Sequence, residues 1–224
     1  PGHSSAASDV YKRQVYRSDL VDPPITDFKQ FWDKKFDGMR GTYITSNTLQ
    51  MVFFLASCQA FGKDAYDLEA GYQAMRDAMP AKISDFTGNM QTLVERGEVQ
   101  IGVQWEGECY LQMDKGIPVD NFIWQHQKPL LTQTHTVSKY SDPVQKKLAL
   151  AYVNEKLDPK FMNKAGETFY LRPTIKNAEL PELLTSKGVK NDANALDGLH
   201  TPDWNFYLEN EDDIVETVNE IFTS

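Results

Sequence analysis

Three consecutive polar residues, Ser46, Asn47 and Thr48, stand where a helix is expected to begin directly after a buried strand. The residues GTYIT at 41–45 predict that strand, and Ser, Asn and Thr are side chains that cap helix N-termini. A helix N-terminus also leaves backbone N–H groups free to hold an anion or a carbonyl oxygen. This segment is therefore a candidate binding site, and a plain helix cap is the alternative reading of Ser46.

Sequence patterns of common enzyme sites are missing. His126, His135 and His200 lack a metal-ligand spacing such as HExxH. Glu106 and Glu108 are near neighbours, but they follow a strand, and we expect them to face solvent. The sequence has no GxSxG elbow, no phosphate-binding P-loop and no dinucleotide-binding glycine fingerprint. We therefore predict no catalytic residue, no metal site and no cofactor.

Composition limits the classes of partner. Of the 224 residues, 41% are hydrophobic and 25% are charged, which is typical of a globular chain. Lys and Arg number 23 against 32 Asp and Glu, so the net charge is −9. An acidic surface repels phosphate backbones, and we expect no nucleic-acid partner. No apolar run approaches the roughly 20 residues that a membrane-spanning helix needs.

The two cysteines, Cys58 and Cys109, allow two interpretations. They are either two buried thiols or a single disulfide, and neither belongs to a CxxC pair that would indicate structural zinc.

The first 14 residues, PGHSSAASDVYKRQ, are low in apolar residues and show no periodicity. Their last six, DVYKRQ, resemble a translated transposon end of the type used in preparing sequencing libraries. We expect residues 1–14 to be a sequencing artefact, so they are excluded from the fold prediction.

Helical and strand-like segments alternate along the rest of the chain. Ser141, Asp142 and Pro143 form a strong helix start, and Asp158 with Pro159 repeats the device. The last helix is expected to carry Asp212 and Asp213 in its first turn. Such alternation predicts an α/β fold with a mainly parallel or mixed sheet. The expected helices are 27–36, 46–60, 64–79, 90–96, 106–115, one starting at 143, one starting at 159 and one near the C-terminus; the expected strands are 15–21, 41–45, 99–105 and 117–124.

Three sequence blocks together resemble the type 2 periplasmic solute-binding proteins of ABC importers, most closely the spermidine/putrescine-receptor group. The blocks are VYRSDLVDPPITDFKQFWDKKFDGMRGTYITSN, ERGEVQIGVQWEGECYLQMDKGIPVD and DPVQKKLALAYVNEKLDPKFMNKAGETFYLRPTIKNA. They match the family's hinge strand and helix-and-turn, its GEVxhGxxWxG segment, and its final helix pair with the following turn. Their common order and spacing cover most of the chain.

The resemblance implies two α/β lobes joined by crossing strands, with the ligand held between them. In the periplasmic binding protein type 2-like fold so implied, residues 22–136 and 174–224 would form a largely complete second lobe. Residues 15–21 and 137–173 would be the hinge and a remnant of the first lobe. Most of lobe one would then lie upstream, and the chain would be an N-terminally truncated fragment.

The resemblance also implies ligand contacts in the second lobe. Ser46, Asn47 and Gln50 occupy the helix start where polyamine receptors carry acidic residues. Trp105 matches a family tryptophan whose ring stacks on amine or alkyl groups through a cation–π attraction of about 0.5–2 kcal/mol. A core tryptophan beside a turn is the alternative. Because Asn47 and Gln50 are amides, we expect free spermidine and putrescine to bind poorly.

Four further positions are carried over from the family. Gln133 and His135 lie near the second crossing, where the family has an aromatic and an acidic residue, and Tyr170 matches the tyrosine of the final turn. Thr87 is chosen by its position in the loop before a short helix. The alternatives are an ordinary surface or core histidine for His135 and core packing for Tyr170.

The resemblance implies a monomeric receptor that captures a small polyamine-like, other amine or organic solute by hinge closure and delivers it to a membrane permease. It would act in the periplasm or outside the cell, with a signal peptide upstream and a membrane tether as a further option. An enzyme built on similar α/β lobes is the alternative, because a fold does not fix a function.

Overall fold

The computed structural model describes residues 4–124, 130–191 and 202–224, and the side chains among them except those of 4–13 and 130–133. The chain forms two compact units. Unit 1 comprises residues 1–10 and 130–198, and unit 2 comprises residues 11–129 and 199–224. The described residues 174–191 therefore group with unit 1, whereas the family resemblance assigned residues 174–224 to the second lobe. The lobe boundaries stay a prediction.

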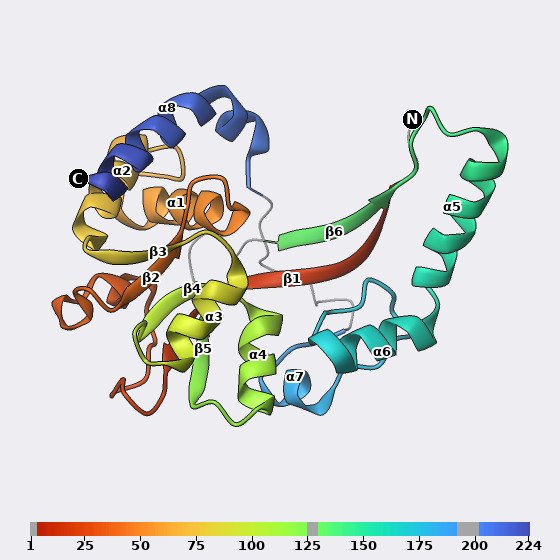
Figure 1. Cartoon of the computed structure of the whole chain (residues 1–224), viewed down its shortest axis with the longest axis horizontal. Helices are drawn as coiled ribbons and strands as arrows, with labels where there is room; N and C mark the ends of the chain where they lie inside the picture. Colours follow the sequence, from red (N-terminus) through yellow and green to blue (C-terminus); the bar gives the residue numbers. More distant parts are fainter. Residues whose placement is uncertain (1–3, 125–129, 192–201) are drawn as a thin grey trace. The chain divides into compact units, whose positions relative to one another are not determined.

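The sheet of unit 2 is mixed, as the alternation of elements predicts. Its strands lie in the order β3 (Ala81–Ser84), β2 (Arg40–Tyr43), β4 (Ile101–Trp105), β1 (Ser4–Arg17) and β5 (Val119–Ile123). Strand β2 runs parallel to β3 and β4, and β1 runs antiparallel to β4 and β5. The three parallel strands therefore end at the same edge of the sheet (Figure 1).

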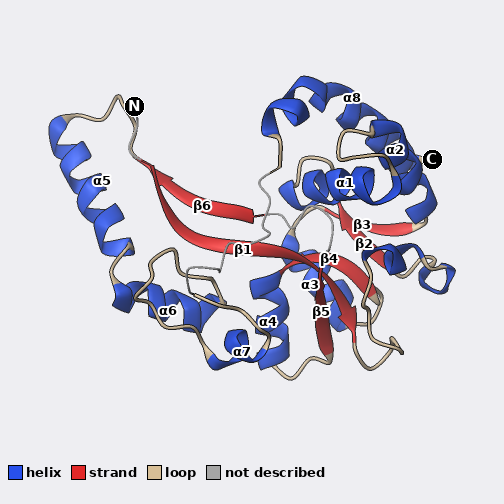
Figure 2. Ribbon diagram, turned by 180° about the vertical axis from the view of Figure 1, so that it is seen from behind, coloured by secondary structure: helices blue, strands red, loops and turns tan. Residues whose placement is uncertain are grey.

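Helices cover both faces of this sheet (Figure 2). Neighbouring residues of strand β2 show which helices cover which face, because successive side chains point to opposite faces of a strand. Thr42 bonds to Gln50 of α1, whereas the Cα of Gly41 lies against Met90 of α3. Helix α1 packs with α2 and α8 on its own side of the sheet. The helices of unit 2 are α1 (Thr48–Phe61), α2 (Leu68–Ala78), α3 (Thr87–Glu95), α4 (Glu106–Asp114) and α8 (Trp204–Thr223).

The segment expected as one helix over 27–36 is two 3-10 turns, Phe28–Trp32 and Lys34–Phe36. The buried Arg40 explains the break. Its guanidinium donates to the carbonyl oxygens of Phe31 and Asp33, at 2.6 and 2.8 Å. Those carbonyls are the acceptors that a continuous helix would need for its own N–H groups.

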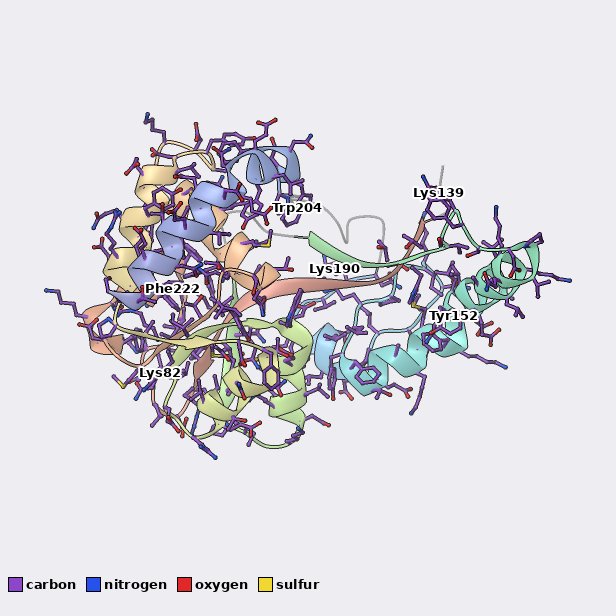
Figure 3. The ribbon with its side chains drawn as sticks, turned by 45° about the horizontal axis from the view of Figure 1, so that its top comes forward. Lys82, Lys139, Tyr152, Lys190, Trp204 and Phe222 are labelled. Atoms are coloured by element: carbon purple, nitrogen blue, oxygen red, sulfur yellow. The ribbon has the colours of Figure 1, made fainter. Side chains whose placement is uncertain are left out.

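Other elements differ from the prediction in ways that follow from local chemistry. Helix α8 begins at Trp204 because the Asp203 side chain accepts from Phe206 N, so Asp212 and Asp213 lie in mid-helix and not in the first turn (Figure 3 labels Trp204 and Phe222 near its two ends). The four residues of β3 were not predicted, because so short a run shows no period. Strand β1 includes residues 4–14, and the fully buried Gln14 donates to Phe28 O.

Both cysteines, Cys58 and Cys109, are buried free thiols. The structure thus selects the first of the two readings left open by the sequence. Burial raises the pKa of Cys58 to about 12, which keeps this thiol protonated at neutral pH.

Unit 1 consists of β6, three helices and the first residues of β1. β6 (Leu130–Thr136) pairs with β1, and the helices are α5 (Pro143–Lys156), α6 (Pro159–Phe169) and α7 (Glu182–Ser186). The predicted helix starts are confirmed: the Asp142 side chain caps α5 while the Asp142 N–H donates to the Gln145 side chain, and Asp158 caps α6.

Helix α5 has no buried residue. Its apolar side chains Val144, Leu148 and Tyr152 are exposed (Figure 3 labels Tyr152). None of the helices in the described residues is long and apolar enough to cross a bilayer.

Candidate functional site

The parallel strands of unit 2 bring three helix N-termini to one edge of the sheet. Strand β2 leads into α1, β3 into α3 and β4 into α4. Ligands of open α/β sheets bind outside the carboxyl ends of such strands. We call this edge the strand-end site. It comprises Tyr43, Asn47, Thr87, Trp105 and Glu108.

The residues between β2 and α1 have different environments. Asn47 is the N-cap of α1, and its side-chain oxygen accepts a 2.9 Å hydrogen bond from Leu49 N. Ser46 precedes it and is exposed. Gln50 is only 2% exposed, and its side chain bonds to the Thr42 hydroxyl and the Met75 sulfur. Gln50 is therefore part of the interior between α1 and the sheet and does not lie at the strand-end site.

Thr87 and Trp105 do lie at the strand-end site. Thr87 is the first residue of α3, and Trp105 is both the last residue of β4 and the N-cap of α4. The Trp105 ring is partly buried and packs against the core of unit 2. The sequence left two interpretations of Trp105, a ring that stacks on the solute and a core tryptophan. The position has features of both, because the ring packs against the core while part of it remains exposed at the strand end.

The remaining predicted residues belong to unit 1. His135 lies on β6, and its ring makes an edge contact with Tyr152 of α5 at 6.0 Å between centroids. Tyr170 ends α6 in the left-handed region, with φ 52° and ψ 34°, and is nearly buried. Gln133 is also on β6, but its side chain lies outside the described residues.

An acidic residue that we expected to face solvent belongs to the strand-end site. Glu108 occupies the first turn of α4, and its carboxylate accepts hydrogen bonds from the Thr87 side chain and from Trp105 N. Its Oε2 atom is buried and has no hydrogen-bond partner among the described residues. Burial raises the pKa of Glu108 to about 7, although the two hydrogen bonds oppose the shift.

The hydroxyl group of Tyr43, at the end of β2, is close enough to Glu108 for the carboxylate charge to act on it. Burial and this charge raise the Tyr43 pKa. Tyr43 is 0% exposed, and its hydroxyl oxygen also has no hydrogen-bond partner within the described residues. Two polar atoms, the Tyr43 hydroxyl oxygen and Glu108 Oε2, are thus buried without the partners that buried polar groups normally have.

Two more residues at these strand ends complete the description. Glu106 was expected in a solvent-facing turn, but it is fully buried because α4 begins directly after β4. Phe86, which precedes α3, is 55% exposed. The signal for Glu108 was present in the sequence, since Trp105 to Glu108 has the spacing of an N-cap and its third helical residue.

The site offers carboxylate, hydroxyl and indole groups around one sheet edge. It contains no group of three or more His, Cys, Asp or Glu side chains that could hold a metal ion, a statement that covers the described residues. Hydroxyl groups together with a carboxylate are suited to a small polar or cationic solute.

Known proteins share the fold of this chain. No protein-family model matches the sequence. The spermidine/putrescine-binding periplasmic protein of Escherichia coli is 23% identical over 186 residues, which are 80% of this chain and 52% of that protein. The crystal structure of the spermidine/putrescine ABC transporter substrate-binding protein of Streptococcus pneumoniae has a TM-score of 0.74 and 16% identity, over 98% of this chain and 69% of that one. The chain has the fold of the periplasmic solute-binding proteins.

A second solved structure with this fold, an ABC transporter protein from Clostridium perfringens, has a TM-score of 0.76 at 16% identity, over 98% of this chain and 69% of that one. The α/β architecture expected from the resemblance is therefore confirmed. The chain spans about half the length of the curated relatives it matches. The relatives from Escherichia coli and Streptococcus pneumoniae are both named as solute-binding proteins.

Proposed function

We propose that this chain is part of a solute-binding receptor of an ABC importer and that the strand-end site contacts the solute. The observation that carries the proposal is the edge at which α1, α3 and α4 all begin, with Trp105 and Glu108 among its residues. The similarity to spermidine/putrescine-binding proteins supports the same function.

The solute is proposed to be a small organic molecule with one cationic group near the strand-end site. Gln50 is in the interior, so its side chain has no part in charge recognition. Asn47 adds an amide and no charge. Glu108 is then the acid with a buried free oxygen that can face a cation. A polyamine brings two or more ammonium groups, and each needs such a partner once it leaves water. A monoamine is the better fit to one carboxylate.

Partners and location follow from the same proposal. The solute would pass to a membrane permease, and the receptor would work as a monomer in the periplasm or outside the cell. The part of the relatives that this chain does not span would supply the opposing binding surface. We therefore expect the 224-residue chain to bind solute more weakly than a longer product of the same gene.

The test is a thermal-shift screen followed by calorimetry, run on the 224-residue chain and on the longer gene product. The compounds are putrescine, spermidine, monoamines, amino acids, and neutral and anionic organic compounds of similar size. Stabilisation of the longer protein by one class supports receptor function. Equal affinity of the two proteins would contradict the fragment prediction, and no response to any class would contradict the receptor.

A further inference from the structure

The proposed function leaves unexplained the protonation state of Glu108 when no solute is bound. Its Oε2 atom is buried and unpartnered among the described residues, and so is the hydroxyl oxygen of Tyr43. Carboxylates enter protein interiors only when they are paired or when they take up a proton. Here the structure offers hydrogen bonds from Thr87 and Trp105 N but no cation.

We propose that Glu108 is protonated in the empty site and that a cationic solute displaces this proton when it binds. The inference rests on the proposed function and adds the release of a proton to the step in which the solute binds. In that step R–NH3+ and the neutral carboxyl group form an ammonium–carboxylate pair, and one H+ passes to the buffer. No bond other than the carboxyl O–H is broken, and the total charge is the same on both sides.

The surroundings of Glu108 allow this exchange near neutral pH. Desolvation is the main cause of its raised pKa, and Thr87 of α3 and the backbone of Trp105 only reduce the shift. The ionisable neighbour in its environment is Tyr43 of β2, whose own raised pKa keeps it neutral. No other charged group among the described residues figures in the shift. An arriving cation is then the strongest influence on the ionisation of this carboxyl group.

The exchange makes affinity depend on pH. With a pKa of about 7, Glu108 is mostly protonated at pH 6 and mostly ionised at pH 8. Amine affinity should therefore rise about tenfold between these pH values. The Glu108→Gln variant should bind more weakly and show no such rise. Tyr43→Phe should weaken binding but keep the pH dependence, because the carboxyl group remains.

The first measurement needs no solute. The side-chain carboxyl resonances of the 224-residue chain are followed by 13C NMR from pH 4 to pH 9, with Glu108→Gln to assign the signal. Glu69→Gln is the matched control, because Glu69 also lies in the first turn of a helix but is exposed. We expect one carboxyl group with a midpoint near pH 7 that only the Glu108 variant removes. A Glu108 midpoint near that of Glu69 overturns the proposal.

The second measurement adds n-butylammonium and putrescine as probes, with calorimetry in buffers of different ionisation enthalpy. A lowered Glu108 midpoint and release of up to one proton per bound amine are expected. An unchanged midpoint at saturating amine overturns the proposal and leaves a bridging water as the occupant. Binding of only neutral or anionic compounds also overturns it, but receptor function would then stand.

Discussion

The Thr42 hydroxyl donates a hydrogen bond to the Gln50 side-chain oxygen in the interior between β2 and α1. The same side chain donates from Nε2 to the Met75 sulfur of α2, at 3.4 Å. Gln50 therefore joins the sheet to two helices. An acid placed at residue 50 would meet core atoms and not a solute.

The first prediction concerns Gln50→Glu. A carboxylate at residue 50 cannot donate to the Met75 sulfur, and its burial removes its hydration. We therefore expect the free energy of unfolding to fall by about 1–3 kcal/mol at pH 7. Urea unfolding followed by circular dichroism measures it, with the exposed Ser46→Ala as control. An unchanged midpoint together with better amine binding would show that residue 50 reaches the solute.

The second prediction concerns Asn47→Asp. Aspartate caps helices as well as asparagine, and its charge is favourable at an N-terminus by about 0.3–1 kcal/mol. We expect unchanged or slightly higher stability and tighter amine binding, because a second acid joins the strand-end site. Asn47→Ala is the control and should cost about 0.5–2 kcal/mol of stability through loss of the cap. Tighter binding of anions by the aspartate variant would contradict this assignment.

The third prediction concerns Trp105→Ala. Loss of the ring should weaken solute binding by roughly 1–3 kcal/mol, the range of aromatic hot spots. The loss of stability should stay below the roughly 3–5 kcal/mol typical of fully buried aromatic residues, because the ring is only partly buried. Calorimetry and thermal unfolding of the longer protein give the two values.

Trp32→Ala provides the comparison for Trp105. The Trp32 ring stacks on Phe53, and its indole N–H donates to Ala74 O at 2.6 Å. This variant should lower stability and leave the affinity of the folded fraction unchanged. If Trp105→Ala behaves in the same way, Trp105 is a core residue only.

The fourth prediction concerns the attachment of α8. The Tyr72 hydroxyl on α2 donates to the Asp213 carboxylate at 2.5 Å, and burial and this bond raise the Tyr72 pKa. Because Asp213 is exposed, we expect a coupling energy of only about 0.5–1.5 kcal/mol between Tyr72→Phe and Asp213→Asn. A double-mutant cycle in urea measures it, and strictly additive losses would contradict an energetic role for the bond.

Local sequence signals predicted the helices and strands well. The caps at Asn47, Asp142 and Asp158 start α1, α5 and α6 as expected, because a side chain and the N–H groups next to it settle a helix start. The 3-10 turns around Phe31 were not predictable in this way. They depend on Arg40, which becomes a neighbour only after the chain has folded.

The candidate site was less predictable for the same reason. Asn47 and Trp105 could be placed at strand ends from order along the chain, whereas Thr87 was placed only in a loop, because β3 was not predicted. Whether Gln50 or Glu108 meets the solute depends on burial, and burial depends on how α1 and α4 begin and pack. The spacing from Trp105 to Glu108 indicated the helix start. Nothing local to the sequence indicated that Thr87 would donate a hydrogen bond to the Glu108 carboxylate or that its charge would act on Tyr43.

The later residues of strand β1, from Tyr11 on, and helix α8 are far apart in the sequence, yet both belong to unit 2. During synthesis, Val15 and Tyr16 leave the ribosome long before their partners Gly102 and Ile101. Met51 and Phe54 of α1 line one small cavity together with Ile214 and Val218 of α8, so this part of the unit also needs α8. Unit 2 therefore cannot complete its fold until α8 has been synthesised. A stop codon ahead of α8 would leave apolar side chains of α1 exposed to water. Such a truncation would therefore destabilise all of unit 2 and not only remove its last helix.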